Sequence, residues 1–281
     1  MGCETVRVYD PTQFKGAARY YRHGRPPYSA QLGDALADEL GLDGTGRLLD
    51  VGSGPGTVGL QLAALFEHVT LLDPDADMLA EARAYVAAEG LAAVDFVQAA
   101  AEDLPDLQLQ RMRTVTFGQS FHRTDRLRVA EAVYDALEPG GAMVLIVHDP
   151  TRPAPQQLPD TPPIPHDEVD RLISAYLGPQ RRSGARPVES YQAERFEQTL
   201  ARTRFGRPRV SYAPGRSDVV RDVDGVVAGF LSMSFAAPHL FGSRLGEFIG
   251  ELRVLLERAS PTSGLFWDWP GDTEILIAER R

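Results

Sequence analysis

The chain has 281 residues, of which 43% are hydrophobic and 24% charged, and its formal net charge is −10. This length and composition predict one large α/β domain with an added lid, or two small domains, and exclude a disordered chain or a fibre. A pI near 5.1 disfavours nucleic acid as a partner, because a phosphate backbone favours a basic protein face. The acidic balance suits a cationic small molecule, although it also serves solubility.

No stretch of the chain reaches eighteen consecutive apolar residues, and the first residues lack a basic and then apolar signal region. The chain has one cysteine, Cys3, which excludes an internal disulfide and a zinc site built from cysteines. We therefore expect a cytoplasmic protein without a membrane partner, either as a monomer or as a homodimer.

Apolar runs alternate with helical patterns in the first half of the chain, which is typical of a doubly wound parallel sheet. The predicted strands lie at about 46–51, 68–73, 94–98, 113–118 and 141–147. Helical spacing is clearest over 76–88 and 126–137, and the second of these helices stops at the sequence Glu138-Pro139-Gly140-Gly141.

Seven prolines lie in the polar stretch 150–165, which excludes a central strand or a helix interior there and indicates a linker. Beyond it, the apolar residues of 169–177 share one helical face and predict a short amphipathic helix that acts as a lid. The later segments predict helices at 193–202, 223–233 and 243–257, and strands at 208–213 and 273–278.

The segment after the first predicted strand has the sequence Asp50-Val51-Gly52-Ser53-Gly54-Pro55-Gly56. Glycines at alternate positions let the backbone turn sharply and approach a ligand, and a helix is predicted over 58–66. A strand, a glycine turn and a helix start together indicate a cofactor site.

Two cofactor classes match this loop. Starting at Gly54, the residues also satisfy G-x-G-x-x-G through Gly59, and Asp73 follows at about the spacing of a dinucleotide fingerprint. In the dinucleotide version the strand runs into the first glycine of the motif, whereas here it runs into Gly52, with Asp50 inside the strand end. The register therefore disfavours an NAD(P)-dependent oxidoreductase, which we keep as an alternative.

The pattern Asp50-x-Gly52-x-Gly54-x-Gly56 resembles motif I of class I S-adenosylmethionine-dependent methyltransferases, in particular the small-molecule subgroup of types 11 and 25. The resemblance implies a Rossmann-like α/β fold with a helical lid and a seven-stranded, mostly parallel sheet whose last strand runs antiparallel between the fifth and sixth. It also implies that the loop, including Ser53, holds the methionine part of the cofactor, whose carboxylate suits free amides and a helix N-terminus.

In such a sheet, ligand chemistry lies at the carboxyl ends of the strands. The second strand ends in Asp73-Pro74, and an acid there can accept hydrogen bonds from both ribose hydroxyls or can cap the following helix. Met78 would lie near the adenine or in the core. Ala101 and Glu102 resemble the stretch that borders the adenine. Because the residue two before Glu102 is an alanine where the family often has an acid, we expect backbone contacts there.

The fourth predicted strand leads into Gln119-Ser120-Phe121-His122-Arg123. Its Ser-Phe-His segment resembles the same subgroup, which commonly has tryptophan where Arg123 stands. We therefore place Gln119 and Ser120 beside the cofactor. The resemblance puts His122 where the methyl group meets the substrate, either as a general base or as a residue that fixes the loop.

The fifth predicted strand ends in His148-Asp149, a second candidate pair for a general base or for substrate binding. Adjacent residues of an extended chain point to opposite faces, so we expect at most one of them to face the site. No spacing among His122, His148 and Asp149 supports a metal site, and none is predicted.

Residues 20–28 are rich in tyrosine and arginine and resemble the N-terminal segment that folds over the cofactor in the same subgroup. In that arrangement Tyr20 or Tyr21 would face the sulfonium, and Arg22 or Arg25 would pair with the methionine carboxylate. A surface turn with packed tyrosines is the alternative.

We divide the chain into a helical cap at 1–45, a cofactor-binding core at 46–149, a linker and lid at 150–205, and a C-terminal part at 206–281 with two strands and the acceptor-site helices. The predicted function is methyl transfer from S-adenosylmethionine to nitrogen or oxygen of a small molecule. That acceptor would be cationic or polyhydroxylated, for example an aminosugar of secondary metabolism and antibiotic biosynthesis. A non-catalytic cofactor-binding regulatory protein is the second alternative.

Overall fold

The computed structural model describes residues 9–149, 151, 158, 161–183, 186–187 and 194–281. Cys3 and four prolines of the predicted linker, Pro150, Pro153, Pro155 and Pro159, lie outside these residues. No helix within the described ranges is long and apolar enough to cross a lipid bilayer.

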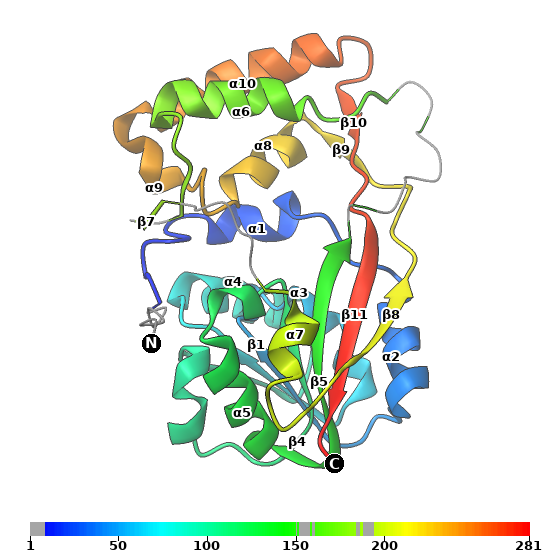
Figure 1. Ribbon diagram of the computed structural model, residues 1–281. Coiled ribbons are helices and arrows are strands. Elements are labelled where there is room, and N and C mark those ends of the chain that lie inside the picture. Colours follow the sequence, from blue (N-terminus) through cyan, green and yellow to red (C-terminus); the bar gives the residue numbers. More distant parts are fainter. Residues whose placement is uncertain (1–8, 150, 152–157, 159–160, 184–185, 188–193) are drawn as a thin grey trace.

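A seven-stranded sheet forms the lower half of the molecule in Figure 1, with the strand order β3-β2-β1-β4-β5-β11-β8. The strands are β1 (Arg47–Val51), β2 (His68–Leu72), β3 (Val94–Val97), β4 (Met112–Gly118), β5 (Leu137–Asp149), β8 (Arg209–Ala213) and β11 (Asp272–Glu279). The first five are parallel, and β11 runs antiparallel to both β5 and β8. The predicted α/β fold is confirmed, including the antiparallel strand that separates the fifth strand from the sixth.

Helices pack on both faces of this sheet. They are α2 (Leu32–Leu40), α3 (Thr57–Gln61) and α4 (Ala76–Glu89) on one face, and α5 (Arg126–Ala136) and α7 (Phe196–Leu200) on the other. Strand β1 shows the reason, since Leu49 and Val51 are buried towards α5 and α7, whereas Leu48 is buried towards the opposite helices. Because both faces are covered, the strand has apolar side chains on both of its sides.

Local capping residues set the bounds of the helices around the site. Asp75 accepts hydrogen bonds from the amides of Asp77 and Met78 at 2.9 and 3.3 Å and so begins α4, which Gly90 ends with a φ of 62°. The helix after the glycine loop is shorter than predicted, because α3 ends at Gln61 and a 3-10 turn, η1 (Ala63–Leu65), follows it.

A cap of helices lies over the carboxyl ends of the parallel strands in Figure 1. It consists of α1 (Ala18–Gly24), α6 (His166–Leu177), α8 (Val223–Leu231), α9 (Pro238–Phe241) and α10 (Leu245–Ala259), with the paired strands β9 (Val220–Asp222) and β10 (Leu265–Trp267). Its own core includes Val169, Phe230, Phe248 and Phe266. The predicted lid helix, α6, therefore packs with helices from the C-terminal quarter of the chain, whereas α7 packs on α5 of the sheet layer.

Helix α1 lies in backbone contact with α8. A Cβ atom on Gly24 would lie 2.3 Å from the carbonyl carbon of Ala228, so only glycine fits at this crossing. The Arg221 guanidinium donates to the Gly24 carbonyl at 2.7 Å and pairs with the Asp268 carboxylate at 2.5 Å. Both side chains of this pair are largely buried, so the end of α1 is fixed to β9 and to the segment after β10.

We expect Gly24→Ala to destabilise the protein by about 1–3 kcal/mol, because the added methyl forces α1 and α8 apart. The measurement is the melting temperature from calorimetry, which should fall by several degrees. The matched control is Gly246→Ala on α10, where a Cβ atom meets nothing within 4 Å and helix propensity favours alanine. Equal melting temperatures for the two variants would contradict the close contact.

Candidate cofactor and acceptor site

The buried side chain of Asp50 holds the glycine loop in place through two hydrogen bonds. Its Oδ2 accepts the Gly59 amide at 2.9 Å, and its Oδ1 accepts the Thr116 hydroxyl at 2.8 Å. Burial raises the pKa of Asp50 to about 7, while these hydrogen bonds act in the opposite direction. Since both oxygens are used inside the protein, Asp50 contributes to the site by shaping the loop that follows it.

The loop turns through three glycines with left-handed backbone angles, φ 63° at Gly52, 54° at Gly54 and 80° at Gly56. The Gly52 and buried Ser53 amides both donate to the Leu72 carbonyl, at 2.8 and 3.1 Å. Ser120 packs against Gly52, where a Cβ atom would lie 2.6 Å from the Ser120 Cβ. Its hydroxyl donates to the Val51 carbonyl at 2.6 Å.

Asp73 lies at the end of β2 and faces the loop. Its Oδ2 accepts the Gly54 amide at 2.8 Å and its Oδ1 accepts the Asp75 amide at 2.9 Å. Burial raises the pKa of Asp73 to about 6. The suggestion that Asp73 caps the following helix is wrong, because Asp75 has that role. Pro74 lies between Asp73 and Asp75, and its carbonyl accepts a hydrogen bond from the Gln98 side-chain amide at 3.4 Å.

One aromatic residue near this acid was missed by the sequence analysis. Burial, together with the charges of Asp75 and Asp73, raises the pKa of Tyr9 well above its usual range. Tyr9 therefore lies in the electrostatic neighbourhood of the strand-end acid. Nothing in its sequence context indicated this, because the contact joins residues more than sixty positions apart.

Helix α1 contacts the glycine loop directly. The Tyr21 ring and the Met78 sulfur lie about 4 Å from the place a Cβ atom of Gly54 would take, at 3.9 and 4.0 Å respectively. Arg22 donates to the Pro55 carbonyl, and its guanidinium lies 3.6 Å from the centre of the Tyr85 ring. The predicted cofactor residues Tyr21 and Met78 therefore converge on Gly54, while Arg22 binds other parts of the protein.

Arg25, just after α1, has a polar atom without a partner. Its guanidinium lies 4.7 Å from the centre of the Tyr21 ring, and its Nη2 donates to the Ser232 carbonyl at 2.9 Å. Its Nε is buried and has no hydrogen-bond acceptor among the described residues. An unsatisfied donor on a charged group is costly, so this position suits an anionic group of a ligand.

On the predicted adenine side, the acidic side chains serve the protein itself. Glu102 accepts the Asp125 amide at 2.8 Å, and Asp103 accepts the Ala100 amide at 3.0 Å. Ala101, which begins the 3-10 turn η2 (Ala101–Asp106), is buried. These contacts leave backbone groups of this segment as the natural adenine contacts, which stays a prediction.

Two histidines lie at the carboxyl ends of neighbouring strands. His122 sits in the 3-10 turn η3 (Phe121–Arg123) after β4, and His148 is the second-last residue of β5. The turn is reached through Gln119, which has a φ of 55° and donates its amide to the Ile146 carbonyl at 3.0 Å. Since β4 and β5 are adjacent and parallel, both histidines belong to the edge of the sheet that the cap covers.

His148 is partly buried under the cap. Its ring stacks on Tyr28, with centres 4.5 Å apart and an angle of 11° between the planes. Burial lowers the pKa of His148 to about 4, and the charge of Arg25 acts in the same direction. Its Nδ1 is buried and has no partner among the described residues. The next residue, Asp149, accepts the amide and the hydroxyl of Thr151 instead.

Across the described parts of the chain, no group of three or more His, Cys, Asp or Glu side chains is placed to hold a metal ion. The polar groups that converge beneath the cap are a strand-end acid, glycine amides, an arginine and a histidine. This set suits an organic ligand with hydroxyl and carboxylate groups.

Comparisons with known proteins agree with this geometry. Residues 48–141 match the family model described as "Methyltransferase domain". No curated protein matches the chain in sequence. Similar solved structures include a candidate methyltransferase of Bacillus halodurans C-125, with 18% identity, a TM-score of 0.48, and coverage of 89% of this chain and 99% of that one.

Two further solved structures are similar to this chain. The YcgJ protein of Bacillus subtilis has 16% identity and a TM-score of 0.47, covering 88% of this chain and 96% of that one. An rRNA methylase of Streptococcus thermophilus has 24% identity and a TM-score of 0.36, covering 42% and 69%. These identities are too low to transfer a substrate.

The family match covers the glycine loop, the strand-end acid Asp73 and the first four strands, and it confirms the predicted methyltransferase over the nicotinamide alternative. The sheet order and the antiparallel β11 are those expected for that fold. Residues 48–141 therefore match a methyltransferase domain, in agreement with the resemblance of the glycine loop to motif I, and S-adenosylmethionine is the cofactor that this match indicates.

Proposed function

We propose that this enzyme methylates a nitrogen or oxygen atom of a small molecule held between the sheet edge and the cap. The observation that carries the proposal is a pair of buried polar atoms, Arg25 Nε and His148 Nδ1, that have no hydrogen-bond partner among the described residues. Buried polar groups without a partner are rare, and a bound ligand is one explanation for them. The two side chains are close enough for the charge of Arg25 to lower the pKa of His148.

The residues of the loop side fit the cofactor. Asp73 is the acceptor for the ribose hydroxyls, Met78 lies on the adenine side, and Arg25 offers its unpaired Nε to the methionine carboxylate. Tyr21 presents its ring to the sulfonium, which an aromatic face stabilises. Because α3 has only five residues, the positive charge for the carboxylate comes from Arg25 more than from a helix dipole. When bound, S-adenosylmethionine supplies an electrophilic methyl group.

His148 orients the acceptor in this proposal. At neutral pH its ring is uncharged, because its pKa is about 4. The Pro26 backbone can only accept, through its carbonyl, so the other ring nitrogen, Nε2, donates to it. Nδ1, which has no partner among the described residues, can then accept a hydrogen bond from an acceptor hydroxyl or amine. Stacking on Tyr28 fixes the ring plane. Holding the nucleophile in line contributes several kcal/mol, and a base would add about 10²- to 10⁴-fold.

His122 remains the candidate general base. It belongs to the turn after β4, at the same sheet edge, and an imidazole is the side chain that most often acts as a general base. In this arrangement His148 accepts a hydrogen bond from the nucleophilic group of the substrate, and His122 removes the proton of that group.

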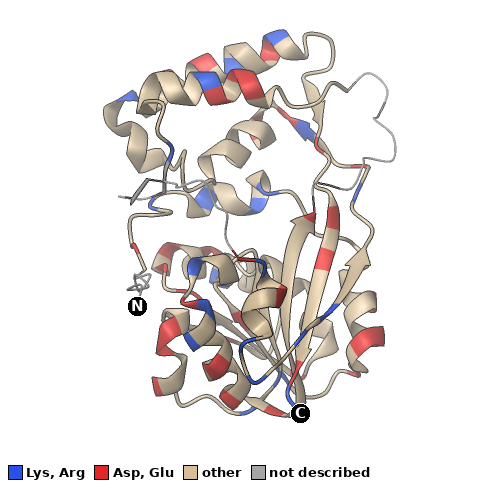
Figure 2. Cartoon of the chain, viewed as in Figure 1, with Lys and Arg blue, Asp and Glu red and all other residues tan. Residues whose placement is uncertain are grey.

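The charge of the protein favours a small acceptor over a polynucleotide. In Figure 2 acidic residues are spread over the helices of both the sheet layer and the cap, mixed with basic residues. With a net charge of −10, such a surface repels a phosphate backbone. An amine-bearing or polyhydroxylated metabolite, such as an aminosugar, matches the buried hydrogen-bonding groups.

The test uses S-adenosylmethionine with a radioactive methyl group and fractionated cell extract. We expect the label to enter the small-molecule fraction and not the RNA or protein fractions. Label in RNA or protein alone would overturn the proposed acceptor class. Tight cofactor binding without labelling of any fraction would favour the non-catalytic regulatory alternative.

We expect cofactor affinity to depend on pH through Asp73. Its pKa of about 6 means that the carboxylate acceptor forms as pH rises, so affinity for S-adenosylhomocysteine should increase from about pH 5 to pH 7 and then level off. Asp73→Asn should weaken binding by about 10- to 100-fold and flatten this pH dependence. Calorimetry measures both, with the exposed Asp77→Asn as control. An unchanged affinity in Asp73→Asn would refute the assignment.

For His148, we expect His148→Gln to lower kcat by about 10- to 100-fold while leaving the cofactor dissociation constant within about threefold. The matched control is Asp149→Asn, which changes the neighbouring residue whose Oδ1 accepts hydrogen bonds from Thr151. The effect is measured as the initial rate at which labelled methyl groups enter the small-molecule fraction. Full activity in His148→Gln, or an equal loss in the control, would exclude the role.

A further inference from the structure

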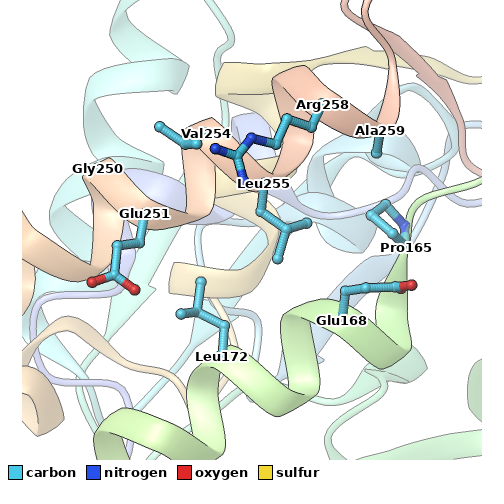
Figure 3. A pocket seen from close by; sticks show the side chains of 9 residues that line it. All are labelled: Pro165, Glu168, Leu172, Gly250, Glu251, Val254, Leu255, Arg258 and Ala259. Atoms are coloured by element: carbon cyan, nitrogen blue, oxygen red, sulfur yellow. The ribbon is translucent and has the colours of Figure 1, made fainter.

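An open groove runs along the outer surface of the cap, between α6 and α10 (Figure 3). Its volume is about 670 Å³, and its floor is formed by Leu172 of α6 and Leu255 of α10. Val254 stands at its edge with 45% of its surface exposed, the most exposed large apolar side chain in the described part of the chain. This groove is remote from the glycine loop, so the methyltransferase site does not explain it.

The two charged residues of α10 that line this groove lie at the two ends of its apolar centre, and Glu168, which lines it from α6, pairs with Arg171 at 3.6 Å. Along α10, Glu251 precedes Val254 by three residues and Arg258 follows it by four. Glu251 is held in place because its Oε1 accepts the Tyr176 hydroxyl at 2.9 Å. Arg258 forms no ion pair with any described residue, although its guanidinium reaches across the helix surface in Figure 3.

The charge pattern of α10 is complementary to the same pattern on a second copy of the helix that runs in the opposite direction. If two copies of α10 lie antiparallel around a two-fold axis between Val254 and Leu255, residues equally far from that midpoint face each other. Glu251 then faces Arg258 of the partner subunit, and the same pair forms again on the other side of the axis. A parallel arrangement would instead set like charges against each other.

Small residues flank the charged pairs and allow the helices to approach. Gly250 and Ala259 also lie equally far from the same midpoint, so each would face the other across the axis. A Cβ atom on Gly250 would meet nothing within 4 Å, so the surface is open there. Small side chains at a crossing permit close packing of the apolar centre.

We propose that α6 and α10 form the interface of a homodimer, with α10 of one copy seated antiparallel along the groove of the other. Val254 and Leu255 fill the centre, and two symmetric Glu251–Arg258 pairs set the register. The proposal is independent of the methyl acceptor, because no residue of the interface belongs to the catalytic site.

Sedimentation velocity on the full chain tests this. We expect a particle of twice the 30.8 kDa chain mass, and Glu251→Arg or Arg258→Glu should each raise the dimer dissociation constant at least about tenfold, since each places two pairs of like charges together. The double variant Glu251→Arg/Arg258→Glu restores both pairs with reversed polarity. It should return the dissociation constant to within about threefold of the starting protein.

The control is Glu257→Arg, an exposed acid on the same helix that does not line the groove. It should leave the dimer intact, and circular dichroism confirms that every variant is folded. A starting protein that is monomeric up to about 100 µM would overturn the proposal, as would a dimer that both single variants leave unchanged. Failure of the double variant to restore the dimer would overturn the antiparallel register.

Discussion

The backbone contact between α1 and α8 at Gly24 determines how the cap meets the sheet. Helix α1 belongs to the cap through this contact and through Arg221, which binds the Gly24 carbonyl and Asp268. The same short helix reaches the glycine loop through Tyr21 and Arg22. Residues from the C-terminal quarter of the chain thus position the side chains that lie over the cofactor loop, and the site is complete only when both ends of the chain are folded together.

Buried acids organise the other side of the site. Asp50 and Asp73 occupy the ends of adjacent strands, and burial raises the pKa of each. Their hydrogen bonds to the amides of Gly59 and Gly54 hold the loop in left-handed turns that cost little for glycine. The burial of the Asp73 carboxylate at the end of β2 lowers the stability of the unliganded protein. Hydrogen bonds from the ribose hydroxyls would offset this loss when the cofactor binds.

The fold and the loop were predictable because their signals are local. Strand periodicity and the register of Gly52 relative to its strand depend on a few neighbouring residues, and the structure agrees with both. The cap was harder to predict, since the Gly24 contact with Ala228 and the stacking of Tyr28 on His148 join residues more than a hundred positions apart. No composition or spacing encodes such pairs. The same limit applies to the choice between Arg22 and Arg25 as the partner of the methionine carboxylate. The two arginines differ only in their contacts with the folded chain, which the sequence does not reveal.

Hydrogen–deuterium exchange of the full chain, with and without S-adenosylhomocysteine, tests most directly whether α1 couples the cap to the cofactor loop. The account predicts that the amides of 52–56, 18–25 and 223–231 gain protection together, because the ligand would bind the loop and α1, and α1 packs on α8. Protection confined to 52–56, with α1 and α8 unchanged, would contradict it.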